Sequence, residues 1–288
     1  MAADFGIFLA VTAMLSWGFA DFLAKKAIDK VGYKTSIVLN QAVSLVPTLI
    51  FASFFFKMPS FSAELILIIV VSGLSGIIGY IFLFRGFQRG NLSVVAPITA
   101  SWSVITVLLA TVLFGEALTL VQIAGIAATL VGVFLASTNL ADLKHSITHR
   151  RSAGATEGII AMVAWGISYA LIKTVTSAIG PVMALLFLKI FAVGILFSWA
   201  GATKAKISLP ARYIFMLIAA AGFLDFLAFI AFNVSLGSQF VSVVTPIVAA
   251  APAVTIVLAY FFLKERVSNS QKLGIIAILF GLVLISLA

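Results

Sequence analysis

Ten apolar segments of about twenty residues each follow one another along the chain, and this pattern constrains the fold more than any other feature. They lie near residues 5–24, 35–56, 63–84, 92–114, 119–138, 156–176, 181–201, 211–233, 240–262 and 270–288. A helix of this length spans a bilayer, whereas membrane strands would show strict alternation of apolar and polar residues. Only 9% of the residues are charged, against about 25% in soluble domains. The sequence therefore predicts an all-α integral membrane protein with ten transmembrane helices.

The second half of the chain repeats the first. Ala-Met-Leu-Ser-Trp-Gly at 13–18 returns as Ala-Met-Val-Ala-Trp-Gly at 161–166. Further pairs follow at offsets of 148 or 149 residues: Lys25 with Lys173, Gly32 with Gly180, Pro97 with Pro246, Glu116 with Glu265, Gly125 with Gly274, and Gly132 with Gly281. Self-similarity over a fixed offset indicates duplication. We expect an N-terminal five-helix repeat at 1–138, a basic linker at 139–155 and a C-terminal five-helix repeat at 156–288.

An odd number of spans in each half predicts that the two repeats are inverted, since the second half must enter the membrane from the opposite side. Charge supports this prediction. Of 18 Lys and Arg residues, 15 lie in the loops after the first, third, fifth, seventh and ninth segments, the exceptions being Lys57, Lys173 and Lys189. The positive-inside rule places those loops in the cytoplasm and both termini outside. We expect a multi-pass protein of the cell membrane.

Several classes of protein are not supported by the sequence. The net charge of +9 comes from residues between apolar segments, not from a basic face on a polar domain, so we expect no nucleic-acid partner. The chain has no cysteine, which excludes disulfides and thiolate ligands. The sequence has no phosphate loop, dinucleotide fingerprint or paired-carboxylate site. We therefore predict no cofactor, no metal site and no catalytic residues.

The duplicated motifs resemble the drug/metabolite transporter superfamily, in particular its ten-helix EamA-type members. The resemblance covers nearly the whole chain. It rests on Trp17-Gly18 and Trp165-Gly166, on the segments that end in Pro97 and Pro246, and on Gly115-Glu116 echoed by Lys264-Glu265. Such a resemblance implies alternating-access transport without catalysis. It also implies a substrate cavity near the midplane, lined chiefly by the first, third, fourth and ninth spans.

Two ionisable residues lie deep inside predicted spans, where a charge costs at least ~2.5 kcal/mol and normally faces the bundle interior. Asp225 corresponds to Gly76 in the first repeat, and Lys189 corresponds to Gln41. Asp225 is either a structural carboxylate or a group that binds substrate or a proton. Proton binding is a candidate role because apolar surroundings favour the neutral form of a carboxyl group. Lys189 either binds an anionic group of the substrate or neutralises Asp225. If the two pair, a zwitterion could compete for both.

Other candidates for substrate binding or gating carry weaker signals. Asp21 is spaced for a helical pair with Lys25, or it acts near a gate; its counterpart is Tyr169. Trp17 and Trp165 lie too far inside their spans for an interfacial belt, and they line a cavity or pack helices together. The remaining candidates for the lining are Gln41, Tyr80, Trp102, Tyr169 and Asn233.

The sequence predicts a secondary active transporter for a small polar metabolite, with an amino acid or related compound as the first candidate. We expect an exporter that works as a monomer in membrane lipid, with the proton as candidate coupling ion. One alternative is an exporter of hydrophobic organic cations, for which Asp21 or Asp225 together with Trp17 would supply the site. An alternative of another class is an intramembrane enzyme or lipid-handling protein. It would need a facing nucleophile and base, and none is evident in the sequence.

Overall fold

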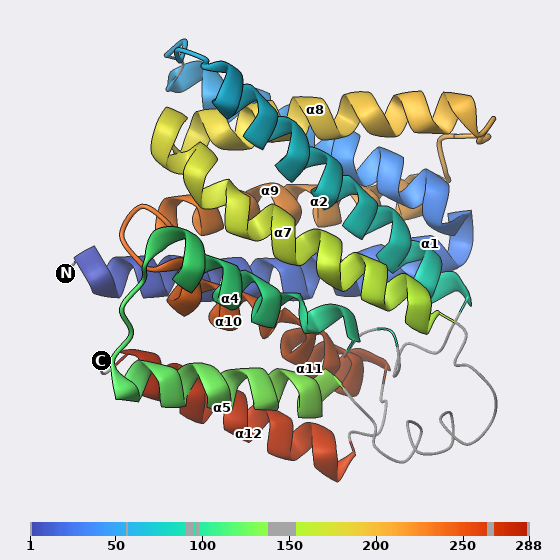
Figure 1. Cartoon of the computed structure of the whole chain (residues 1–288). Helices are drawn as coiled ribbons and strands as arrows, with labels where there is room; N and C mark the ends of the chain where they lie inside the picture. The colour runs from blue at the N-terminus through green and yellow to red at the C-terminus, as the bar shows by residue number, and fades with distance from the viewer. Residues whose placement is uncertain are drawn as a thin grey trace.

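A computed structural model describes residues 2–55, 57–89, 95, 98–137, 154–263 and 268–286. Within these ranges the chain is helical and contains no strand. The helices are α1 (Ala2–Phe54), α2 (Ala63–Arg89), α4 (Trp102–Phe114), α5 (Leu120–Ser137), α7 (Ala155–Ile179), α8 (Pro181–Ala202), α9 (Arg212–Ser235), α10 (Val241–Ala249), α11 (Ala251–Leu263) and α12 (Asn269–Ser286). They form the long bundle of Figure 1. Most of the predicted linker, Pro97, and the Lys264-Glu265 motif lie outside the described residues.

Helix α1 contains two membrane spans. Its 53 residues correspond to roughly 80 Å of helix, more than twice the thickness of a hydrocarbon core. Gly32 interrupts it with φ 75° and ψ 165°, a conformation essentially restricted to glycine. Figure 1 shows α1 running away from the N-terminus, reversing, and returning along the bundle. Gly180, the counterpart of Gly32, separates α7 from α8 with φ 80° and ψ 159°, so the sequence repeat is also a conformational repeat.

The glycine at the α7–α8 reversal provides a test of this geometry. We expect Gly180→Ala to destabilise the protein by roughly 1–3 kcal/mol, because alanine does not tolerate this backbone conformation. The new methyl group itself meets open space. The matched control is Gly194→Ala within α8, which also meets nothing within 4 Å and should stabilise the helix by about 0.5–1 kcal/mol. Thermal unfolding in detergent measures both; equal melting temperatures for the two variants would contradict the assignment.

The six long apolar segments and three shorter apolar helices of the described chain give ten spans when α1 is counted as two. One of these spans, Val241–Phe262, consists of α10 and α11 and bends at Ala250. The predicted all-α membrane fold with ten spans is therefore confirmed.

The crossing of α5 and α12 shows how the repeats are oriented. A Cβ atom on Gly281 would lie 2.6 Å from the Gly125 oxygen, and one on Gly132 would lie 2.8 Å from the Gly274 oxygen. Because Gly125 matches Gly274 and Gly132 matches Gly281, exchanging the repeats exchanges the two contacts. Only a two-fold relation between antiparallel helices does this, and Figure 1 shows α5 and α12 side by side. The two repeats are therefore inverted, as predicted.

Helices of one repeat pack mainly against helices of the other. First-repeat helices α1, α2, α4 and α5 contact α9, α7, α10 and α12 of the second repeat, respectively. The largest buried cluster accordingly joins Trp17 and Trp102 to Tyr169 and Phe232. The outer surface exposes large apolar side chains such as Val112 and Leu120, at 81% and 84%, which suits contact with lipid. The centre of the protein is thus the interface between the two repeats.

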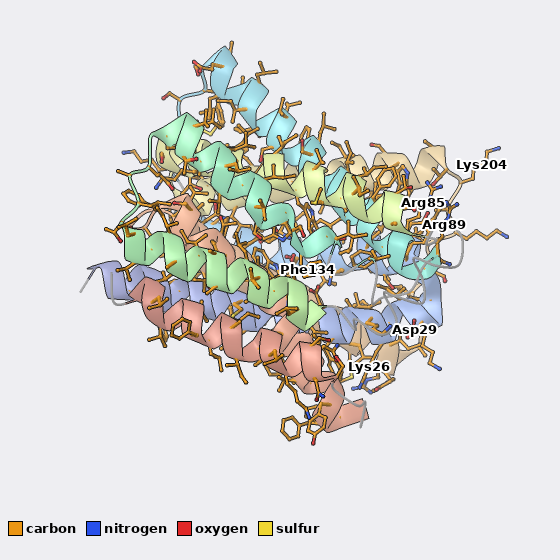
Figure 2. All side chains as sticks on the ribbon, turned by 60° about the horizontal axis from the view of Figure 1, so that its bottom comes forward. Lys26, Asp29, Arg85, Arg89, Phe134 and Lys204 are labelled. Carbon is orange, nitrogen blue, oxygen red and sulfur yellow. The ribbon has the colours of Figure 1, made fainter. Side chains whose placement is uncertain are left out.

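Basic side chains gather at one end of the bundle. Figure 2 shows Lys26, Arg85, Arg89 and Lys204 at this end, which we call the basic end. Here Arg89 and Arg85 approach Glu157 at 3.1 Å and 3.6 Å. The opposite end, where α4 and α9 finish and α10 begins, is called the far end. The charge rule predicts that the basic end faces the cytoplasm.

Candidate functional site

A buried carboxylate from the middle of α9 forms the centre of the candidate site. Asp225 is only 3% exposed. It accepts hydrogen bonds from Trp17 Nε1 (3.1 Å), Tyr80 OH (3.1 Å), Ser44 Oγ (3.0 Å) and, at longer range, Gln41 Nε2 (3.4 Å). All four donors belong to the first repeat, whereas Asp225 belongs to the second. The carboxylate therefore joins the two repeats at their interface.

The buried ammonium group of Lys189 in α8 completes this cluster. It forms an ion pair with Asp225 and donates a hydrogen bond to Gln41 Oε1 at 2.8 Å. It also lies 4.4 Å from the centre of the Phe229 ring, a distance at which a cation is attracted to an aromatic face. Buried charges are tolerated when they are paired and hydrogen-bonded in this way. Of the two interpretations of Lys189 in the sequence, neutralisation of Asp225 describes the structure as it stands.

Beside this cluster lies a chamber of about 620 Å³ walled by aromatic side chains. Its aromatic residues are Trp17, Tyr80, Trp102, Trp165 and Tyr169. Tyr169 stacks on Trp102 at 4.4 Å between ring centres, and Trp165 meets Tyr80 edge-on at 5.1 Å. Thr99, Ala100 and a stretch of α10 and α11 complete the wall. We call this space the aromatic chamber.

Asp21 supplies a carboxylate to the aromatic chamber. Its side chain is exposed, and it forms no hydrogen bond or ion pair with any other residue that the structure describes. The expected helical pair with Lys25 is therefore not formed. An exposed pair of this spacing stabilises a helix by only about 0.3–0.5 kcal/mol, too little to hold two flexible side chains together. Asp21 thus offers the aromatic chamber a carboxyl group that is available to a ligand.

A second chamber of about 510 Å³ lies on the other side of the buried cluster. Its polar groups come from Gln41, Lys189 and Asn233, and from Ser72 and Ser168, which bond to each other across α2 and α7. The Asn233 side chain accepts a hydrogen bond from Thr176 at 2.7 Å. Tyr80 lines both chambers, and its hydroxyl donates to Asp225. The hydrogen-bonded cluster therefore separates the two chambers.

The structure brings all ten candidate residues of the sequence to this central region. Trp17, Gln41, Tyr80, Lys189 and Asp225 form the buried cluster; Asp21, Trp102, Trp165 and Tyr169 line the aromatic chamber; Asn233 lines the second chamber. Sequence reasoning missed Ser44, whose hydroxyl donates to Asp225. A lone serine in an apolar span is a weak signal, although its spacing of three from Gln41 puts both on one helix face.

A bundle of two inverted five-helix repeats, embedded in lipid and enclosing charged and aromatic chambers at its centre, has the architecture of a membrane transporter. The comparison with known families agrees. The chain belongs to the EamA-like transporter family, whose model matches residues 4–138 and 152–287. The family places the protein within the drug/metabolite transporter superfamily that the duplicated motifs predicted.

Individual relatives are distant. An uncharacterized transporter of Archaeoglobus fulgidus is 24% identical over 282 residues, which is 98% of each chain. An uncharacterized protein of Methanocaldococcus jannaschii is 27% identical over 134 residues, 46% of this chain and 97% of that protein. The likeness to the second protein thus spans about one repeat. A solved crystal structure shares the fold with a TM-score of 0.79 and 15% identity, covering 98% of both chains.

Proposed function

We propose that this transporter is a secondary carrier for small compounds that bear a positively charged nitrogen, with amino acids as the first class of substrate. The observation that carries the proposal is the carboxylate of Asp21 in the aromatic chamber, which pairs with no other residue in the described part of the chain. A cation there meets one negative charge and the faces of several aromatic rings, and both attract it.

Proton coupling follows from the same carboxylate. Asp21 can hold either a proton or the amine of a substrate, but not both at once. A proton-driven exporter exchanges one proton for one substrate cation across the membrane. The inward movement of a proton on Asp21 would then return the empty carrier after it has released its substrate outside.

An amino acid offers a second contact that a simple amine lacks. Its carboxylate could pair with the Lys189 ammonium in place of Asp225. Tyr80 would then move together with Asp225, because it lines both chambers and donates a hydrogen bond to this carboxylate. This competition makes binding and rearrangement of the two repeats a single event. A second candidate substrate is an organic cation without a carboxylate. Its favouring observation is that the described residues lining the aromatic chamber include no basic side chain.

Transport by the purified protein in proteoliposomes tests the proposal. We suggest three solutes that share a benzene ring and differ in charge: phenylalanine, phenyltrimethylammonium and benzenesulfonate. We expect the first two to move and to respond to a pH gradient, and the sulfonate not to move. Faster movement of phenylalanine favours amino acids, and faster movement of phenyltrimethylammonium favours organic cations. Preferential transport of benzenesulfonate would contradict the proposal, and protein-free liposomes provide the baseline.

A further inference from the structure

A glutamate of the first repeat binds the start of a helix of the second repeat at the far end. Glu116 follows α4, where Gly115 ends the helix in a left-handed conformation with φ 60°. Its carboxylate accepts hydrogen bonds from the backbone nitrogens of Val241 (2.7 Å) and Ser242 (2.9 Å), and from the Ser242 hydroxyl. The N-terminus of a helix favours negative charge, so these are charge-assisted bonds at the start of α10.

The same region is held from a second direction. The connection between α9 and α10 covers residues 236–240, and the Lys173 ammonium of α7 donates to the Leu236 carbonyl at its start. The beginning of α1 also packs closely here, since a Cβ atom on Gly6 would lie 2.6 Å from Gln239 Cγ. Glu116 and Lys173 thus hold the two ends of one short connection, which we call the far-end connection.

Different contacts between the repeats are described at the two ends of the protein. Lys25 is the repeat counterpart of Lys173, yet it forms no hydrogen bond or ion pair with another residue of the described ranges. One turn away, Asp21 is exposed in the aromatic chamber. The contacts of Glu116 and Lys173 hold the far end together, whereas at the basic end Arg85 and Arg89 of α2 pair with Glu157 of α7. In a carrier built from inverted repeats, contacts between the repeats at one end must break when that end opens.

We propose that Glu116 and Lys173 form a latch that closes the second chamber at the far end, and that its release opens this end. The proposal rests on the carrier function proposed above and specifies how access to the central site is controlled. The state that is closed at the far end has the charge-assisted hydrogen bonds of the latch, and the state that is open at this end lacks them. Weakening the latch therefore shifts the population toward the state that is open at the far end.

The absence of cysteine from the chain allows a direct test with single-cysteine reporters. Ser72→Cys places a thiol in the second chamber and Ala100→Cys places one in the aromatic chamber. Labelling by a polar maleimide is followed in lipid nanodiscs, where both ends are accessible. With Glu116→Gln, which keeps the shape and removes the charge, we expect Ser72→Cys to react about tenfold faster. Ala100→Cys should react more slowly.

The matched control is Glu157→Gln, the same substitution at the basic end, where Glu157 pairs with Arg89; it should leave Ser72→Cys slow. Lys173→Met removes the other half of the latch and should act like Glu116→Gln. Opposite changes at the two reporters support the latch, because general unfolding would speed both. If neither Glu116→Gln nor Lys173→Met produces opposite changes, the proposal is overturned. Labelling needs no substrate, so failure of the amine hypothesis would leave this test intact.

Discussion

Replacing Lys189 by methionine is expected to destabilise the protein by roughly 3–5 kcal/mol, the usual cost of removing one partner from a buried ion pair. Asp225 is 3% exposed, and in this variant its buried carboxylate would keep only neutral hydrogen-bond donors and no positive charge beside it. Methionine occupies a similar volume, so a cavity contributes little to the effect. The shift in thermal unfolding in detergent measures the loss.

The double variant Lys189→Met with Asp225→Asn separates charge from packing. Removing both charges leaves a neutral amide that can still accept from Trp17 and Tyr80, and we expect most of the stability to return, as it does when buried pairs are replaced together. In transport, this variant should lose its preference for phenylalanine over phenyltrimethylammonium, since Lys189 no longer offers an ammonium to a carboxylate. A single Lys189→Met variant as stable as the wild type, with wild-type transport, would contradict both expectations.

Asp21→Asn is expected to lower transport of amine-bearing substrates by roughly 10- to 100-fold, because the substrate loses a charge-assisted hydrogen bond of ~1.5–3 kcal/mol. Stability should change little, since Asp21 forms no bond to the rest of the described structure. Initial rates of uptake into proteoliposomes measure the effect, and the residual flux should no longer respond to a pH gradient.

Asp29→Asn provides the matched control for Asp21→Asn. It makes the same substitution on the same helix, at an exposed residue of the basic end that does not line either chamber. We expect wild-type transport from it. Unchanged transport in Asp21→Asn, or an equal loss in both variants, would show that the carboxylate of the aromatic chamber does not bind the substrate.

The positions of the helices and their inversion could be predicted from the sequence with little error. The prediction succeeded because the same motifs occur in each half, such as the Trp-Gly pair and the glycines at 32 and 180. Both halves also lie in the same bilayer, which requires apolar helices of similar length from each. The boundaries of the repeats and the transport roles of the candidate residues stay predictions. The charged and amide candidates were found because such side chains are expensive in lipid, so few are present without a partner. The tryptophans at 17 and 165 were found because they lie inside their spans instead of at the ends.

The contacts among those residues were harder to predict from the sequence. The expected pair of Asp21 with Lys25 was wrong, because local spacing permits a weak pair without requiring it. The capping of α10 by Glu116 could not be predicted, because nothing in the Gly115-Glu116 motif says which helix it meets. Ser44 was missed because one hydroxyl among apolar residues has no periodic pattern of its own.

The sequence by itself determined that this chain lies in a membrane as ten helices in two inverted repeats. Hydrocarbon forces every backbone polar group into helical hydrogen bonds, and that requirement acts on each segment separately. Only the tertiary structure decided which polar side chains meet. Trp17 reaches Asp225 across 208 positions of sequence, and Glu116 reaches Ser242 across 126. Such contacts depend on how two packed repeats fit together, which no local segment specifies.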